Sequence, residues 1–270
     1  MIHFLALLLY IGAFVFWSRA LWRGPRGSET GVAFALSAAG VAVHALALVQ
    51  YTLDSGELPL AGLAPSLSTL ALIIGLGLMG TLVLGEASRV GIVLVPLIVL
   101  LEGTAAFMGV TPRAGPPLDF QGVWFSLHVT LAFAGYGGMA VAFAGGLLYL
   151  IQFHELKDKH LGRLFRFLPP LTTLDRLVKT GITVGIISLG LALILGWAWT
   201  VRFRGTFQVW DPKVAWGVFS WGMLVTAMGF RLGAGRKERR GALAAVVAFG
   251  IVVLAYVVLR TTGVHEGFFL

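Results

Sequence analysis

Residues 31–51 read G-V-A-F-A-L-S-A-A-G-V-A-V-H-A-L-A-L-V-Q-Y, without a single Asp, Glu, Lys or Arg. About 20 mostly apolar residues in an α-helix are long enough to cross the hydrocarbon core of a bilayer. The stretch therefore predicts a transmembrane helix. His44 lies near its middle, and an ionisable side chain at that depth is a candidate for function. It could ligate a haem within the membrane, or it could be a neutral imidazole hydrogen-bonded to a Ser or a backbone carbonyl.

The rest of the chain has the same character. Of its 270 residues, 58% are hydrophobic and only 12% are charged, whereas soluble domains carry about 25% charged residues. This composition excludes a cytosolic enzyme, a secreted domain and a disordered chain. The absence of cysteine excludes a thiolate metal site or a thiol relay within the chain. We expect an all-α integral membrane protein in which residues 1–270 form a single polytopic domain, a bundle of eight transmembrane helices. The expected spans are about 3–22, 31–51, 66–85, 90–110, 122–153, 179–200, 213–232 and 241–260.

Two of these spans have further features. The fifth is too long for one bilayer, and we expect it to continue into water as a helix that carries His154, Glu155 and Lys157. It also repeats a small residue every fourth position, at Ala134, Gly138, Ala142 and Gly146. Such a stripe is typical of a helix-packing face in membranes. The first span has neither a basic segment before it nor a small-residue cleavage site, which favours a retained span over a signal peptide.

The basic residues predict the orientation. Fifteen of the 20 Lys and Arg residues fall within residues 19–26, 89, 157–179 and 231–240, which are the connections on one side of the expected bundle. Loops rich in Lys and Arg stay in the cytoplasm. We therefore expect both termini on the outer side of a bacterial cytoplasmic membrane. Nucleic-acid binding is disfavoured, because the positive charge is spread over short membrane loops.

The outer side gathers the residues with chemical interest. His128 opens the fifth span, His265 follows the eighth, and residues 196–216 between spans six and seven read G-W-A-W-T-V-R-F-R-G-T-F-Q-V-W-D-P-K-V-A-W. Imidazole is a good axial ligand for haem iron. Aromatic side chains can cover the flat macrocycle, and cations can pair with its propionates. The candidates are Trp197, Trp199, Phe207, Trp210 and Trp216 for the ring, and Arg202, Arg204, Lys213 and Arg113 for the propionates.

Simpler interpretations stay open at this point. Trp and Phe at membrane edges are ordinary interfacial anchors. Asp211 and Pro212 form a good helix start, with the Asp as N-cap and the Pro in the first helical position. Glu102, inside the fourth span, is expected to be neutral and bonded to Thr104 or to a nearby helix. His3, at the outer start of the first span, is given no role.

The segment W210-D-P-K-V-A-W-G-V-F-S-W221 resembles the tryptophan-rich "WWD" signature of haem-handling cytochrome c assembly proteins. The most similar type is the CcsA (ResC) subunit of the system II cytochrome c synthetase, and CcmC and HemX proteins are relatives. Weaker similarities follow the same order along the chain, at H44-A-L-A-L, L127-H-V-T-L-A-F-A-G-Y136, L174-D-R-L-V-K-T-G181 and G263-V-H-E-G267.

The resemblance implies a site and a function. Its haem ligands would be His128 and His265, and its platform would run from Trp197 to Trp216, including Asp211, Pro212 and Lys213. The protein would hold haem b at the external face for covalent attachment to apocytochrome c, at most as one subunit of a haem–cytochrome c synthetase. The implied partners are a CcsB/ResB-like membrane subunit, apocytochrome c and a thiol-reducing protein.

The sequence departs from the family pattern at several positions. Arg204 and Gln208 replace aromatic residues, and Val214 replaces a Glu. Gly229 stands where full synthetases often carry a His in the seventh span, which bears on whether haem crosses the membrane through this chain. The departure gives weight to an alternative, a HemX-like membrane regulator of haem synthesis that acts on glutamyl-tRNA reductase. A transporter of another small molecule is a third possibility.

Overall fold

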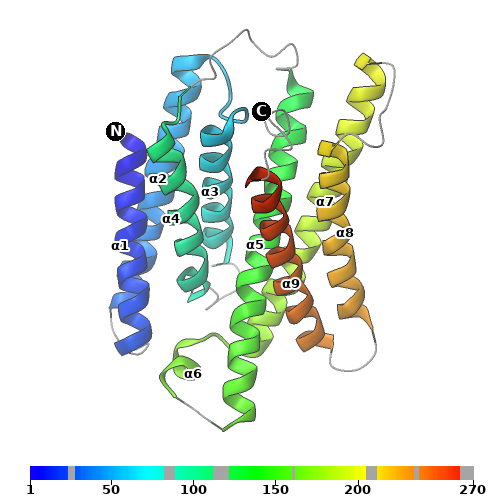
Figure 1. Ribbon diagram of the computed structural model, residues 1–270. Helices are drawn as coiled ribbons and strands as arrows, with labels where there is room; N and C mark the ends of the chain where they lie inside the picture. The colour runs from blue at the N-terminus through cyan, green and yellow to red at the C-terminus, as the bar shows by residue number, and fades with distance from the viewer. Residues whose placement is uncertain are drawn as a thin grey trace.

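A computed structural model describes residues 1–23, 28–81, 89–111, 122–159, 162–204, 212–233 and 237–261. These ranges are almost entirely helical, and the long helices run up and down the molecule (Figure 1). The helices are α1 (Ile2–Arg23), α2 (Glu29–Ser55), α3 (Leu63–Gly80), α4 (Gly91–Met108), α5 (Val123–Lys157), α6 (Arg163–Phe167), α7 (Leu171–Arg204), α8 (Pro212–Leu232) and α9 (Lys237–Thr261).

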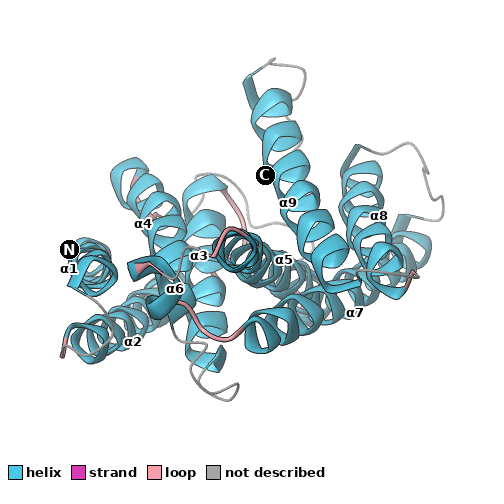
Figure 2. Cartoon of the chain, turned by 90° about the horizontal axis from the view of Figure 1, so that it is seen from below, coloured by secondary structure: helices cyan, strands magenta, loops and turns pink. Residues whose placement is uncertain are grey.

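The long helices form two groups on either side of α5. Helices α1 to α4 lie together on one side, and α7, α8 and α9 lie on the other (Figures 1 and 2). Helix α5 packs against α3 of the first group and against α7 and α9 of the second. The buried side chains divide in a similar way, since one cluster centres on Tyr10, Trp17 and Leu94, and another on Met139, Ile182 and Leu224. The central position of α5 explains why this helix is so rich in small residues.

Each of the eight expected spans overlaps one long helix. Seven helices, all except α6 and α8 among the described residues, are long and apolar enough to cross a membrane. Helix α8 has 21 residues, but its Gly, Ser and Trp residues lower its mean hydropathy. It packs along α7 and α9 like the other members of its group. The integral membrane class is therefore supported, and the eighth crossing stays a prediction.

The connection between α5 and α7 differs from the expectation. The sixth span was expected to begin at residue 179, whereas α7 begins at Leu171, directly after Pro169 and Pro170. The backbone carbonyl of Pro170 accepts hydrogen bonds from the amides of Thr173 and Leu174, which closes the first turn. The short helix α6 was not expected, and it packs its fully buried Phe167 against the bundle.

The small-residue stripe of α5 is a packing face, as expected. A Cβ atom on Gly138 would lie 2.8 Å from the carbonyl oxygen of Gly181 in α7, and one on Gly181 would lie 2.7 Å from the amide nitrogen of Ala142. On the neighbouring turn, a Cβ on Gly146 would lie 2.8 Å from the carbonyl oxygen of Ala242 in α9. Backbone atoms therefore meet directly at these crossings, which only glycine permits.

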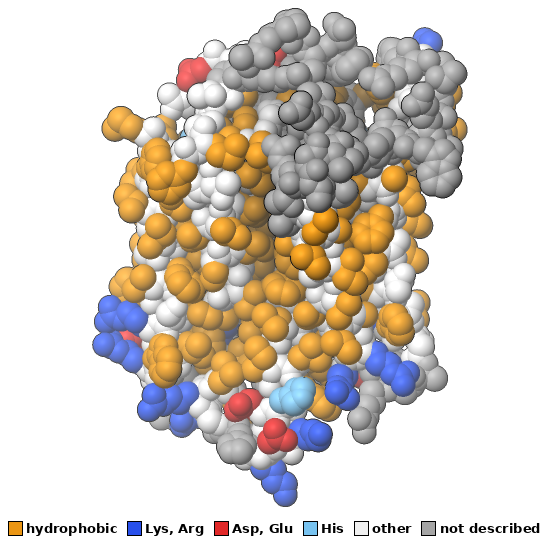
Figure 3. Space-filling view, in the orientation of Figure 1, with side chains coloured by type: hydrophobic (Ala, Val, Ile, Leu, Met, Phe, Trp, Pro, Cys, Tyr) orange, Lys and Arg blue, Asp and Glu red, His pale blue; other side chains and the backbone are white. Residues whose placement is uncertain are grey.

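The basic residues gather at one end of the molecule. The C-terminal ends of α1, α3 and α8 and helix α6 lie at the lower end in Figure 1, and most visible Lys and Arg side chains lie there, below a broad band of hydrophobic surface (Figure 3). At this end Arg231 of α8 donates two hydrogen bonds to Asp175 of α7, with Nη1–Oδ1 and Nη2–Oδ2 distances of 2.5 and 2.6 Å. The charge asymmetry expected from the sequence is thus present in three dimensions.

Candidate functional site

The side chain of His128, near the start of α5, lies against the C-terminal half of α7. Its Nδ1 atom is 2.7 Å from the carbonyl oxygen of Ala192, and a Cβ on Gly196 would lie 3.0 Å from its Cε1 atom. The imidazole ring therefore packs against the backbone of α7, at a position where a larger residue would crowd it. The ring is only partly buried, so one side of it stays accessible.

One hydrogen bond orients the ring of His128. A carbonyl oxygen only accepts, so Nδ1 carries a proton, and in a neutral imidazole Nε2 then keeps its lone pair. Among the described residues, Nε2 has no hydrogen-bond partner. Histidines that ligate metals commonly donate their other ring N–H to a carbonyl or a carboxylate, which orients the ring and makes the ligating nitrogen more basic. The hydrogen bond from His128 to Ala192 is of this kind.

The two Trp residues that follow Gly196 face different directions. An α-helix turns about 100° per residue, so Ala192, Gly196 and Trp199 lie on one face of α7, which is the face against His128. Trp199 is half-buried, whereas Trp197 is 52% exposed. Of the predicted platform residues in α7, Trp199 is thus the one placed beside the imidazole. Arg202 is exposed near the end of the helix.

Trp216 and Trp221 connect α8 to its neighbours. Helix α8 begins at Pro212, as the helix-start interpretation expects. The Trp216 ring centroid lies 6.2 Å from that of Tyr256 in α9, and the Trp221 indole donates a hydrogen bond of 3.1 Å to the carbonyl of Ile186 in α7. These contacts hold α8 between the helix that carries Trp199 and the helix that leads to His265.

Part of the predicted site lies outside the described residues. His265, Phe207, Trp210, Asp211 and Arg113 belong to this part. Arg204 ends α7, and Pro212 and Lys213 open α8. Their membership of a helix is all that is described for these three residues. The pairing of His128 with His265 therefore stays a prediction.

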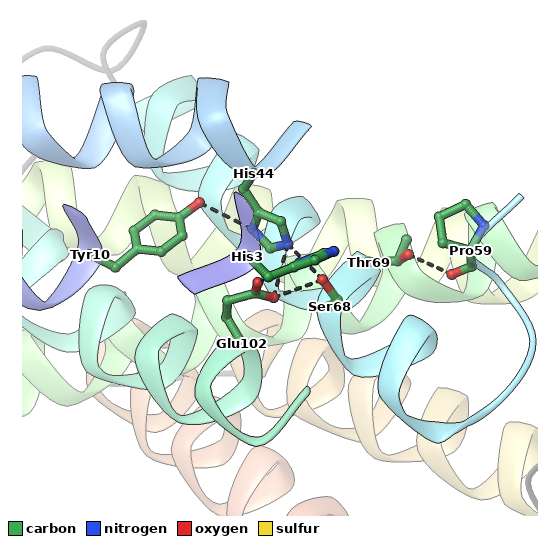
Figure 4. Close-up of polar contacts among 7 residues, drawn as sticks. All are labelled: His3, Tyr10, His44, Pro59, Ser68, Thr69 and Glu102. Atoms are coloured by element: carbon green, nitrogen blue, oxygen red, sulfur yellow. Dashed lines mark hydrogen bonds and ion pairs between the residues drawn. The ribbon is translucent and has the colours of Figure 1, made fainter. Parts of the chain in front are cut away.

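His44 belongs to a second group of polar residues, within α1 to α4 (Figure 4). Its Nε2 atom is 2.8 Å from Ser68 Oγ and 3.0 Å from Glu102 Oε2, and its Nδ1 atom is 3.4 Å from the Tyr10 hydroxyl. The expectation of a His bonded to a Ser is confirmed. Both ring nitrogens are engaged and the side chain is fully buried, so ligation of a haem by His44 would require this group to open.

Glu102 and His3 complete the group, and the sequence analysis did not place them together. Glu102 Oε1 lies 2.8 Å from His3 Nδ1, and Ser68 donates a hydrogen bond of 2.7 Å to Glu102 Oε2. The suggested bond to Thr104 was wrong, because the Thr104 hydroxyl donates to the carbonyl of Leu100 in its own helix. The alternative partner, a nearby helix, was right. A comparison of how deep each polar residue lies in its span could have indicated this group.

Gly229, at the position of the family's intramembrane His, lies on the surface. An open groove of about 360 Å³ is lined by Thr226, Gly229, Phe230, Gly233 and Arg240. A Cβ on Gly229 would meet nothing within 4 Å. Among the described residues, this position therefore has space for a side chain but no ligand of its own.

These observations define a polytopic helical membrane protein with a partly buried imidazole, hydrogen-bonded to a backbone carbonyl, near one end. The sequence matches the family model of cytochrome c assembly proteins over residues 2–265. The chain therefore belongs to the cytochrome c assembly protein family, and its relatives confirm the CcsA type.

Three relatives illustrate the similarity. The cytochrome c biogenesis protein CcsA of Prochlorococcus marinus strain MIT 9303 is 26% identical over 91% of this chain and 86% of the relative. CcsA of Chlamydomonas reinhardtii is 28% identical over 83% of this chain and 65% of the relative. CcsA of Cyanidium caldarium is 25% identical over 50% of this chain and 53% of the relative. A role in cytochrome c biogenesis follows. The HemX-like alternative receives no support from these relatives.

Proposed function

We propose that this protein binds haem b at the outer end of its helix bundle and holds it for covalent attachment to apocytochrome c. In this proposal it acts in a system II type of assembly, as a subunit of a haem–cytochrome c synthetase together with a CcsB/ResB-like membrane protein. Membership of the cytochrome c assembly family supports the role in general. The particular site rests on the geometry around His128.

The tautomer of His128 is the observation that carries the proposal. Its Nδ1–H group donates to the carbonyl of Ala192, which in this proposal leaves Nε2, without a partner among the described residues, to ligate the iron. Little conformational entropy is lost when haem binds, because the imidazole ring is already oriented before the iron arrives. Trp199 lies on the same face of α7 and would contact the porphyrin.

The second ligand in the proposal is His265. Helix α9 ends at Thr261, so His265 follows it after only three intervening residues. The contact of Trp216 with Tyr256 holds the end of α9 beside α8. The platform would be completed by the segment between α7 and α8, with Phe207, Trp210 and Asp211, and by Pro212 and Lys213 at the start of α8. Arg202, Arg204 and Arg113 would pair with the propionates.

Covalent attachment of haem requires the reactants to be positioned more than it requires a catalytic group. In thioether formation, the S–H bond of each apocytochrome thiol adds across a haem vinyl group, without net oxidation or reduction. The thiols belong to the substrate, which is consistent with a chain that has no cysteine of its own. The protein would fix the ring edge and exclude competing orientations. A separate thiol-reducing partner would keep the apocytochrome thiols reduced.

One of the two imidazoles must leave the iron when the His of the apocytochrome haem-binding motif arrives. His128 is held by α7, whereas His265 follows the last helix of the described chain.

The localisation proposed is the bacterial cytoplasmic membrane, with the site on the extracytoplasmic side. This side is opposite the basic end of the bundle.

The proposal is tested in cells that lack their own cytochrome c assembly proteins. The chain is expressed with a CcsB-like partner and a reporter cytochrome c, and covalently bound haem is stained after denaturing electrophoresis. We expect His128→Ala and His265→Ala each to lower haem-stained cytochrome at least tenfold at equal protein levels. His154→Ala, in the basic half of α5, is the matched control. Wild-type yield from both variants would contradict the proposal.

A further inference from the structure

The group around Glu102 is a built cluster of metal-ligating side chains, separate from the proposed haem site. His3 comes from α1, His44 from α2, Ser68 from α3 and Glu102 from α4 (Figure 4). His44, Ser68 and Glu102 have no exposed surface, and the His3 side chain is only 16% exposed. Four helices thus direct their polar side chains to a single buried point.

The donor atoms are close enough to share one ion. One nitrogen from each imidazole and one carboxylate oxygen all lie within 4.8 Å of one another. His3 Nδ1 is 2.8 Å from Glu102 Oε1, and His44 Nε2 is 3.0 Å from Glu102 Oε2. A tetrahedral ion with ligands at about 2.1 Å needs donor atoms about 3.4 Å apart. Side-chain adjustments that bring the three donors to this separation would admit an ion.

The surroundings of His44 favour ligation. Its Nδ1 atom faces the Tyr10 hydroxyl at 3.4 Å, while Nε2 points toward Glu102 and Ser68. An imidazole whose outer nitrogen is held by a hydroxyl presents its other nitrogen in a defined direction. The His3 and His44 rings lie edge to face, with centroids 6.0 Å apart. Both rings are therefore directed at the same carboxylate from different helices.

The charge of the group also favours a bound metal ion. A carboxylate buried in a membrane bundle is costly unless a positive charge or a proton accompanies it. Without a metal, the two imidazoles can supply a proton to Glu102. A divalent ion can replace that proton, and it would be held by three protein ligands with Ser68 beside the fourth position. Two His and one carboxylate with an open position form a common donor set for zinc and for non-haem iron.

We propose that His3, His44 and Glu102 bind one divalent first-row transition metal ion of borderline softness, such as Zn²⁺, between helices α1 to α4. The ion ties α1, α2 and α4 together at the end of the bundle where α1 begins. The partly exposed ring of His3 is the route by which the ion enters. The proposal does not rest on haem binding, because its ligands all lie in the other group of helices.

The test uses the full-length protein in detergent, treated with a chelator and free of haem. Co²⁺ is titrated first, because its visible absorption reports a tetrahedral nitrogen–oxygen site, and Zn²⁺ then displaces it in competition. We expect one Co²⁺ per wild-type chain. The Glu102→Gln, His44→Gln and His3→Gln variants should each bind at least tenfold more weakly. His154→Gln, which alters an exposed His at the other end of the bundle, should bind as the wild type does.

The outcome stays decisive if a buried variant misfolds. His3→Gln changes the most exposed ligand at the very start of α1, and each variant is checked by size-exclusion chromatography before titration. Added Zn²⁺ should also raise the melting temperature of the wild type but not that of His3→Gln. The proposal is overturned if the wild type shows no saturable binding of one Co²⁺, or if folded His3→Gln binds with wild-type affinity. The group would then be a hydrogen-bond network alone.

Discussion

His128 and His44 are both imidazoles in membrane helices, and their neighbours give them different chemistry. His128 has one nitrogen bonded to a carbonyl and the other without a partner among the described residues. His44 has both nitrogens within reach of hydroxyl and carboxyl groups and no exposed surface. His128, the proposed haem ligand, thus differs from His44 in two ways: one of its ring nitrogens has no partner among the described residues, and its ring is partly exposed.

At this scale the sequence correctly predicted that His128 lies near the start of α5, since a His that opens a span stands out in an apolar chain. It did not predict the grouping of His3 with Glu102. These residues are 99 positions apart, and their contact depends on how α1 and α4 align in depth. Helical periodicity fixes the direction of a side chain within one helix, but not the alignment of two helices.

Gly196 provides a test at the residue scale. A valine there would place its Cβ 3.0 Å from Cε1 of His128, which should turn the imidazole away from its hydrogen bond to Ala192. We expect Gly196→Val to weaken haem binding roughly tenfold, the size of effect typical when a ligand loses its orienting contact. Haem titration of the purified protein measures it. Gly222→Val is the control, because a Cβ on Gly222 meets nothing within 4 Å; equal affinity in both variants would argue against the role given to Gly196.

At the scale of helices, α5 and α7 cross so closely that a Cβ on Gly138 or on Gly181 would meet the backbone of the other helix. The stripe of small residues in α5 predicted a packing face, and the structure supplies the partner, Gly181 of α7. The partner could not be predicted, because several helices of this chain carry glycines. The early start of α7 was also missed, since its first turns contain Asp175 and Arg176 and do not look like a membrane span.

A single substitution at this crossing is expected to lower the stability of the protein strongly. Gly138→Val forces a side chain against the backbone of Gly181 and Gly185, neither of which can move away without separating the helices. We expect it to destabilise the folded protein by about 3 kcal/mol, the upper part of the usual range for overpacking. Thermal unfolding in detergent measures the loss. Gly250→Val, in open space on α9, should change little, and a similar loss in both would show that helix propensity rather than packing is responsible.

Across the whole molecule, the two groups of helices have their basic residues at the same end. The basic connections lie together at one end, and His128, Trp199 and the polar cluster lie toward the other. The sequence predicted this separation because Lys and Arg are easily counted loop by loop. It also predicted eight crossings, although α8 falls short by hydropathy. Trp216 and Trp221, which lower its hydropathy, also contact α9 and α7.

The orientation can be tested directly because the chain has no cysteine. Asp54→Cys places an exposed thiol near the end of α2, and Asp158→Cys places one directly after α5. A membrane-impermeant maleimide should label the first in intact cells and the second only after the membrane is permeabilised. The reverse pattern would place the proposed haem site in the cytoplasm and exclude a role in attaching haem outside.

The central claim is that an imidazole at the outer end of the bundle binds haem iron, and an absorption spectrum tests it most directly. Protein made with ample haem is purified in detergent as wild type, His128→Ala and His154→Ala. The account predicts a Soret band and reduced α and β bands in the wild type and in His154→Ala, weakened bands in His128→Ala, and their recovery when imidazole is added. A colourless wild type, or bands of equal strength in all three proteins, would contradict it.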